Sequence, residues 1–298
     1  MVTLITCVDD AGSGRKIADA LNMYIPTQSY SLVHPPGLIK WGVKLPLLTT
    51  YSELQRIVLK SDLVIIKSNE GFDGNNFGRI KIPCKTIQIV NGSKFRRKIR
   101  NDPELNFVKE YKADINCYLT EDLYVPGWEY MPHAWNNFNY QFQKAEKFKI
   151  LHIIGTNINK GESIIRSAVE ELGREDVEFV CKKDITQKEI AEIWGNTAVY
   201  VEFFKSKVMV NGVMRGGYGN GVIQAMSQDI PTRTFSPQPT ITYSVDEISS
   251  EVLKKTLQVL LDWDKLEQVS KQQFQAVQEK HSYEVIGKKW FELVKKLI

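Results

Sequence analysis

Short apolar runs alternate with amphipathic stretches along almost the whole chain, and no other feature constrains the fold as strongly. The apolar run VTLITCV at residues 2–8 predicts a buried strand. The stretch at 14–24 places Ile17, Ala18 and Leu21 on one face, which predicts a helix. Strands that alternate with helices build strand–helix–strand units around a parallel sheet, so the expected fold class is α/β.

The same alternation continues to residue 136, and a first domain is therefore expected at 1–136. Residues 137–146, NFNYQFQKAE, are polar and aromatic without a clear period, which predicts a linker. The further elements predicted in the first domain are a helix at 50–61, strands at 62–67 and 85–92, a basic helical piece at 95–100, and strands at 113–120 and 129–132.

The alternation starts again after the linker, which indicates a second domain at 147–282. Gly173 is expected to end the first helix of this domain, because glycine is favoured just past a helix C-terminus. Thr186 and Glu189 have the spacing of a capping box. The predicted elements are strands at 148–155, 177–182, 197–204 and 230–235, and helices at 161–173, 186–195, 221–228, 245–263 and 265–298, the last with a break near 281–283. Two Rossmann-like domains are expected, with a ligand cleft beyond the carboxyl ends of their strands.

The composition is typical of a folded globular protein. The 298 residues are 43% hydrophobic and 25% charged. No stretch has the features of a signal peptide or the length of a membrane span, so we expect a cytoplasmic protein without stable membrane insertion. The net charge of +4 is mild for this length and does not by itself indicate a nucleic-acid partner.

The four cysteines, Cys7, Cys84, Cys117 and Cys181, lie far apart in the sequence. No CxxC spacing and no His-x-x-x-His pair accompanies them. They predict buried reduced thiols, and neither a disulfide framework nor a metal site is expected.

A glycine-rich turn, RGGYGNG at 215–221, leads directly into the apolar stretch VIQAMSQ. Glycines before a helix commonly expose backbone N–H groups to an anion, because a helix N-terminus carries partial positive charge. The turn therefore predicts an anion site in the second domain.

Several motifs of the second half occur in a recognisable order. GTNINKG at 155–161 precedes VEFVC at 177–181, and GGYGNGVIQAMSQDIPTRTF at 216–235 follows. Together they resemble the donor half of a GT-B glycosyltransferase, closest to glycosyltransferase family 4 and similar to its small virus-encoded members. In the first half, DINCYLTED and VPGWEYMPHAWN match the family more loosely.

This resemblance implies two Rossmann-like domains with parallel sheets that face an interdomain cleft, and a C-terminal helix at 283–298 that crosses back to the first domain. It implies a hexosyltransferase that moves a sugar from a nucleotide-diphosphate sugar, such as UDP-glucose or GDP-mannose, to an acceptor with retention. The departing phosphate takes the acceptor proton, so no protein base, metal or cofactor is expected. The resemblance does not determine whether the acceptor is a glycan, a protein, a lipid or a modified base. It does not determine the oligomeric state either.

By the same resemblance, Lys160 supplies the main cation for the departing diphosphate. Arg215 is the expected second catalytic residue, with Lys182, Lys183 and Arg97 as alternatives for that second cation. The residues expected to bind the donor or its nucleotide are Gly12, Ser13, Gly14, Asn157, Lys182, Lys183, Gly216, Gly217, Tyr218, Gly219, Asn220, Gly221 and Gln224.

Some positions depart from the family pattern. The family has a glutamate at each end of an eight-residue spacing, where this chain has Gly216 and Gln224. The Gln224 amide can accept a ribose hydroxyl, but Gly216 cannot hold the sugar through a carboxylate, so the sugar identity stays open. Thr156 and Asn157 stand where the family has an arginine. These departures leave a non-catalytic sugar-nucleotide or glycan-binding protein as an alternative.

In the first domain, the loop DDAGSGRK follows the first strand, where the family lets a glycine loop approach the donor phosphates. The alternative is a tight turn with Asp10 or Ser13 as the helix cap. The acceptor-side candidates are Asn91, Arg97 and His133. Asn91 stands where the family often has a histidine. His133 is a separate candidate, and a lone histidine of this kind is more often structural than catalytic.

The run SKFRRKIR at 93–100 has five positive charges around Phe95 and Ile99. It is consistent with a solvated surface, with a docking patch for an anionic acceptor such as nucleic acid or a membrane, or with direct contact to donor phosphate. A GT-B enzyme that glycosylates modified DNA is the further alternative that this run leaves open.

Overall fold

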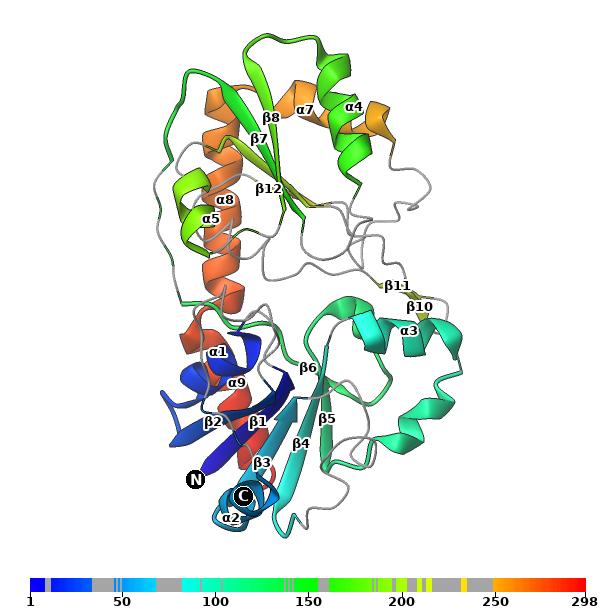
Figure 1. Cartoon of the computed structure of the whole chain (residues 1–298), viewed down its shortest axis with the longest axis vertical. Coiled ribbons are helices and arrows are strands. Elements are labelled where there is room, and N and C mark those ends of the chain that lie inside the picture. The colour runs from blue at the N-terminus through cyan, green and yellow to red at the C-terminus, as the bar shows by residue number, and fades with distance from the viewer. Residues whose placement is uncertain are drawn as a thin grey trace. The chain divides into compact units, whose positions relative to one another are not determined.

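The computed structural model describes most of the chain, and its polypeptide divides into two compact units (Figure 1). The first unit comprises Met1–Asn136, Val208–Arg215 and Lys280–Ile298, and the second comprises Asn137–Lys207 and Gly216–Glu279. The described residues are 1–8, 12–33, 46, 48, 50–67, 82–91, 93–102, 104–136, 138, 140, 142–154, 161–183, 185, 187–194, 197–202, 208–210, 213–215, 232–234 and 249–298.

A six-stranded parallel sheet with the order β2-β1-β3-β4-β5-β6 forms the first unit. Val2 lies opposite Thr27 on one side and Leu63 on the other, so β1 is an interior strand. This arrangement confirms the α/β fold class, because parallel neighbours require the crossover helices that the alternation predicts. The strands are β1 (Val2–Val8), β2 (Thr27–Val33), β3 (Leu63–Lys67), β4 (Lys85–Val90), β5 (Ile115–Tyr118) and β6 (Glu129–Tyr130).

Helices accompany this sheet at the positions that the amphipathic stretches predict. The start of α2 is stabilised by a capping box, in which the Glu53 N–H donates to Thr50 Oγ1 and the Thr50 N–H donates to the Glu53 carboxylate, each at 3.2 Å. The helices of the first unit are α1 (Ser13–Leu21), α2 (Tyr51–Leu59), α3 (Ser93–Asn101), the 3-10 helices η4 (Asn106–Glu110) and η5 (Glu121–Leu123), and α9 (Tyr283–Lys295).

Strand β2 is an addition to the sequence prediction, which has no strand between residues 24 and 50. Its sequence, TQSYSLV, is largely polar, and Gln28 is exposed while Ser31 is buried. The strand is the last in the order of the described sheet, where it pairs with β1; on its other side the Ser31 N–H donates to the Pro46 carbonyl oxygen (3.0 Å) and the Leu48 N–H donates to the Ser31 carbonyl oxygen (2.9 Å). A half-exposed edge strand does not need the continuous apolar run by which the interior strands are recognised.

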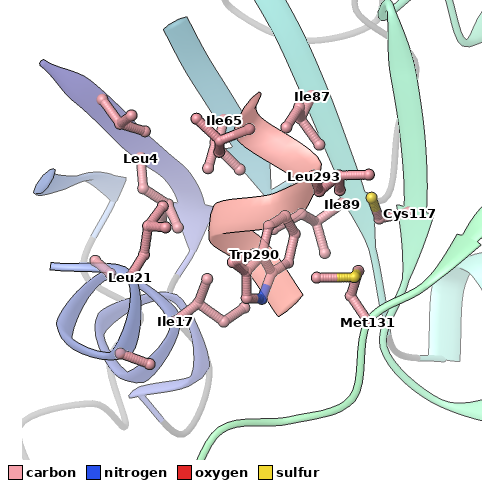
Figure 2. Close-up of a cluster of buried hydrophobic side chains, with 14 of the residues drawn as sticks. Leu4, Ile17, Leu21, Ile65, Ile87, Ile89, Cys117, Met131, Trp290 and Leu293 are labelled. Carbon is pink, nitrogen blue, oxygen red and sulfur yellow. The ribbon is translucent and has the colours of Figure 1, made fainter. Parts of the chain in front are cut away.

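Helix α9 completes the core of the first unit, although it comes from the end of the chain. Its Trp290 is fully buried and lies beside Ile17, Ile89 and Met131 (Figure 2). Close packing of α9 on α1 depends on Gly287, because a Cβ atom there would lie 2.2 Å from the carbonyl oxygen of Ala20.

The second unit contains a four-stranded parallel sheet with the order β12-β9-β7-β8. Gly173 ends α4 in the left-handed conformation, with φ 61°, as the sequence predicts. Thr186 of the predicted capping box lies outside the described residues. The elements are β7 (Phe148–Ile154), α4 (Glu162–Leu172), β8 (Val177–Lys183), α5 (Gln187–Trp194), β9 (Val199–Glu202), β12 (Thr232–Thr234), α7 (Ser250–Leu260) and α8 (Trp263–His281).

Aromatic side chains join α8 to the rest of the second unit. Phe148 of β7 stacks on Trp263, with ring centroids 4.4 Å apart. Phe138 and Tyr140, from the predicted linker, both contact the Phe274 ring edge-on, at 5.9 and 5.3 Å. This part of the linker therefore packs on α8 instead of running free through solvent.

A short antiparallel hairpin, β10 (Val208–Val210) and β11 (Val213–Arg215), was not predicted. It contacts α3 and η5, and so belongs to the first unit. The predicted break in the last helix is confirmed: α8 ends at His281, and the Val285 N–H donates to Ser282 Oγ at the start of α9 (3.3 Å).

Candidate functional site

Polar and charged residues from several elements lie at the carboxyl edge of the first sheet. Because the strands are parallel, the residues that end them meet at one edge. Lys67 is the last residue of β3, Asn91 follows β4, and Thr120 follows β5. Asn91 is half-buried, whereas Lys67 and Thr120 are buried.

The turn into α1 also lies at this edge. Gly12 precedes the helix with φ 67°, a conformation that favours glycine. Ser13 and Gly14 follow as the first buried residues of α1. No side chain caps this helix in the described part of the turn, so the prediction of Ser13 as the cap is wrong: Ser13 is inside the helix and Gly12 occupies the cap position. Asp10 lies outside the described residues.

His133 lies in the segment that follows β6, and its environment is cationic. Its side chain is 6% exposed, and its Nδ1 has no hydrogen-bond partner among the residues that the structure describes. Burial, followed by the charges of the nearby His281, Lys16, Lys67 and Arg96, lowers the pKa of His133 to about 3. The imidazole is therefore neutral at physiological pH. We refer to Lys16, Lys67, Arg96 and His133 as the His133 cluster.

Each cation of the His133 cluster is held by a different element. Lys16 of α1 places Nζ 3.6 Å from the ring centroid of Trp135, a cation–π contact. Arg96 of α3 donates from Nη2 to Thr120 Oγ1 at 3.4 Å. Lys67, at the end of β3, is only 4% exposed. Lysine is rarely buried to this extent unless the charge has a specific role or partner.

Backbone contacts with the junction of α8 and α9 hold His133 in place. His281 donates from Nδ1 to the carbonyl oxygen of His133 at 2.8 Å. The Trp135 N–H donates to the carbonyl oxygen of His281 at 2.7 Å. Burial also lowers the pKa of His281, so both imidazoles favour the neutral form. The backbone of His133 is therefore fixed by the junction of α8 and α9, while its side chain belongs to the His133 cluster.

The described part of α3 does not present a continuous basic face. Phe95 and Ile99 are buried, and Lys98 donates to a Glu110 carboxylate oxygen at 2.7 Å. Arg96 faces Thr120, which leaves Arg97 as the exposed cation among residues 95–99. The side chains of Ser93, Lys94 and Arg100 lie outside the described ones.

In the second unit, Lys182 and Lys183 end β8, and both are exposed. Lys183 Nζ lies 3.3 Å from a carboxylate oxygen of Glu162, in the first turn of α4. Glu162 also accepts from Arg166 at 3.0 Å, and this hydrogen bond, together with Lys183, lowers the pKa of its carboxyl group. Lys183 therefore lies beside the N-terminus of α4, and Gly161 directly precedes that helix.

Most of the predicted donor-binding residues cannot be placed. Arg215 ends β11, but its side chain is outside the described ones. The following lie outside the described residues altogether: Asn157, Lys160, Gly216, Gly217, Tyr218, Gly219, Asn220, Gly221 and Gln224.

Over the described ranges, no group of three or more His, Cys, Asp and Glu residues could hold a metal ion. None of the described helices is both long and apolar enough to cross a bilayer. The four cysteines are free thiols; Cys117 is buried and the other three are half-buried.

The sequence analysis did not identify Lys16, Lys67 or Arg96 individually as site residues. Lys67 carried the clearest signal, because it ends the otherwise apolar strand LVIIK at the edge where ligands of parallel sheets bind. Arg96 was included only as one charge of a basic run, and nothing local distinguishes it from Arg97.

Solved structures of other proteins have the same fold as this chain. No protein-family model and no curated protein sequence matches the chain. Among solved structures, Anabaena Alr3699/HepE in complex with UDP and glucose superposes with a TM-score of 0.68 and 9% identity, covering 99% of each chain. A glycosyltransferase from Rickettsia africae has a TM-score of 0.60 and 10% identity, covering 99% of this chain and 98% of that one.

Sucrose-phosphate synthase from Thermosynechococcus elongatus has a TM-score of 0.56 and 12% identity, covering 100% of this chain and 99% of that one. The chain thus has the α/β fold of GT-B glycosyltransferases over its full length. At these identities the likeness establishes the fold alone.

Proposed function

We propose that the protein is a glycosyltransferase that moves a hexose from a nucleotide-diphosphate sugar, preferably a UDP-sugar, to an acceptor. The observation that carries this proposal is the full-length likeness to HepE, whose structure contains UDP and glucose. The similarity to HepE covers both units of the chain, as expected if the protein has the complete architecture of such a transferase.

The proposed reaction transfers the sugar with retention and without a metal. The bond between the sugar C1 and the diphosphate oxygen breaks, and the nucleoside diphosphate leaves with the bonding electrons. The acceptor oxygen bonds to C1, and its proton passes to the leaving phosphate oxygen. By the family resemblance, Lys160 and Arg215 stabilise the charge on that phosphate. Lys183, which lies beside the start of α4 and 3.3 Å from Glu162, is a described cation of the second unit and is a further candidate for this role.

The alternative is a protein that binds a sugar nucleotide without turnover. Gly216 and Gln224 favour this alternative, because both family glutamates are missing at these positions. The DNA-modifying alternative receives little support from α3, where Lys98 is paired and Arg96 faces Thr120.

Incubation of the purified chain with UDP-, GDP- and dTDP-sugars in the presence of EDTA tests the proposal. Released nucleoside diphosphate is measured by coupled assay, and binding by calorimetry in parallel. We expect one UDP-sugar to release UDP. Binding of a donor without release would support the non-catalytic alternative. Neither binding nor release of any donor would overturn the proposed function.

A further inference from the structure

We propose that the His133 cluster binds a phosphate group carried by the acceptor. The inference rests on the proposed function, because it specifies the acceptor of that reaction as a phosphate monoester. The cluster comes entirely from the first unit: Lys16 from α1, Lys67 from β3, Arg96 from α3 and His133 from the segment after β6.

The chemistry of the cluster matches a phosphate. Lys67 ends β3, Arg96 bonds Thr120 just after β5, and Lys16 contacts Trp135, two residues from His133, so these cations come to the carboxyl edge of the parallel sheet, where ligands commonly bind. Charged donors to phosphate oxygens make short, strong hydrogen bonds, and arginine can engage two oxygens together. Since Lys67 is 4% exposed and Thr120 is 6% exposed, such contacts would be shielded from solvent and screened little by salt.

His133 offers the unsatisfied polar atom that a ligand would satisfy. Its Nδ1 is buried without a hydrogen-bond partner, which costs free energy unless something else compensates. A neutral imidazole with its proton on Nδ1 donates one hydrogen bond, and a phosphate oxygen accepts it. Burial first, and the cationic neighbours second, keep this imidazole neutral in the free protein, and a bound phosphate dianion would oppose the effect of those neighbours.

The acceptor is favoured over the donor diphosphate because the resemblance assigns other residues to the donor. Lys160, Arg215 and the glycine turn at 216–221 are the groups expected to hold the diphosphate. None of them belongs to the His133 cluster. The other donor residues that the resemblance names in the first unit, Gly12, Ser13 and Gly14, lie at the same sheet edge as the cluster, and the competition with UDP described below tests whether the donor reaches it.

Binding of inorganic phosphate to the full chain tests the site without any need for turnover. The His133 Hε1 resonance is followed by NMR at pH 7 during a phosphate titration, at constant ionic strength maintained with chloride. We expect a saturable shift of this resonance and an increase in melting temperature. A resonance that does not move at any phosphate concentration would overturn the proposal, and this measurement requires no variant.

Two pairs of variants locate the phosphate. Lys67→Met and Arg96→Gln remove cations of the cluster, while Lys60→Met and Arg56→Gln make the same changes at exposed positions of the first unit. We expect each cluster variant to weaken phosphate binding by about tenfold or more, and each control to bind as the parent does. Equal phosphate affinity in all four variants would contradict the proposal. Melting curves without phosphate show which variants are folded.

Repeating the phosphate titration in saturating UDP distinguishes a site for an acceptor phosphate from a site for the donor diphosphate. An acceptor site predicts that phosphate still shifts the His133 resonance when UDP is bound. Competition between UDP and phosphate would instead assign the cluster to the donor and overturn the inference. With an active donor in hand, Lys67→Met should raise the KM of a phosphorylated acceptor about tenfold and leave donor affinity unchanged. Failure of turnover with retained phosphate binding would refute the proposed function but not the phosphate site.

Discussion

Acidification should destabilise the first unit through His133. The pKa of this residue is about 3 in the folded protein, against an ordinary value of 6.5, because the side chain is buried and its charged neighbours are positive. Between these two values the unfolded chain binds a proton that the folded protein does not. Stability is therefore fully present above pH 6.5 and falls as the pH decreases toward 3.

The magnitude follows from the difference between the two pKa values. One proton taken up on unfolding changes the free energy of unfolding by about 1.4 kcal/mol per pH unit. Lowering the pH from 6.5 to 5 should thus remove about 2 kcal/mol through His133 alone. His281 acts in the same direction, because its pKa is also lowered by burial.

A His133→Gln variant isolates this contribution. Its free energy of unfolding should vary less between pH 7.5 and 5 than that of the parent, by about 2 kcal/mol, since carboxylate titrations are common to both proteins. Hydrogen exchange of core amides in β1 and α9 reports the opening of the first unit specifically. NMR of the parent should show a His133 Hε1 shift that stays constant over the same range.

Parallel pH profiles for the parent and His133→Gln would refute this reasoning. So would a His133 resonance that titrates with a midpoint near its ordinary pKa of 6.5, because the imidazole would then be charged without loss of the fold. In that case the cations assigned to the His133 cluster would not lie close enough to act on it.

Further predictions concern the donor and the packing of α9. UDP should raise the melting temperature in EDTA, and an absolute requirement for manganese would contradict a metal-independent site. Lys160→Ala should lower donor turnover about 100-fold or more with little change in donor Kd, while Lys147→Ala, at an exposed position directly before β7, should match the parent; an unchanged rate in Lys160→Ala would remove Lys160 from the site. Gln224→Ala should weaken UDP binding by about 1 kcal/mol without altering the melting temperature of the free protein, and a change in stability alone would make it only a helix residue. Gly287→Ala should destabilise the protein by about 1–3 kcal/mol in urea unfolding, because its Cβ would lie 2.2 Å from the Ala20 carbonyl oxygen; parent-like stability would show that α1 and α9 are less closely packed.

The local sequence determined the interior strands and most helices. The strands β1, β3, β4 and β7 are largely apolar because they are buried on both faces of their sheets. Burial of this kind can be predicted from the composition of the strand itself. The end of α4 at Gly173 and the helix break at Ser282 were predictable for a similar reason, since a backbone conformation and a cap are properties of a few consecutive residues. The order of motifs also predicted the GT-B fold, which the solved structures share.

The edge strand β2 and the β10–β11 hairpin were not predicted. Strand β2 is only partly buried and tolerates polar residues that conceal its pattern, whereas β10 (VMV) and β11 (VMR) are apolar but have only three residues each, too few to show a period. The hairpin contacts α3 and η5, which lie far from it in the sequence, and periodicity carries no information about such contacts.

The His133 cluster was decided by the tertiary structure alone. Lys16, Lys67, Arg96 and His133 share no spacing, and each belongs to a segment whose pattern explains it locally as a helix face, a strand end, a basic run or a loop. They meet because parallel pairing brings the carboxyl ends of the strands to one edge, and because the junction of α8 and α9 holds the His133 backbone there. Burial and the summed charge of neighbours then determine the protonation of His133, and both quantities exist only after remote segments of the chain have packed together.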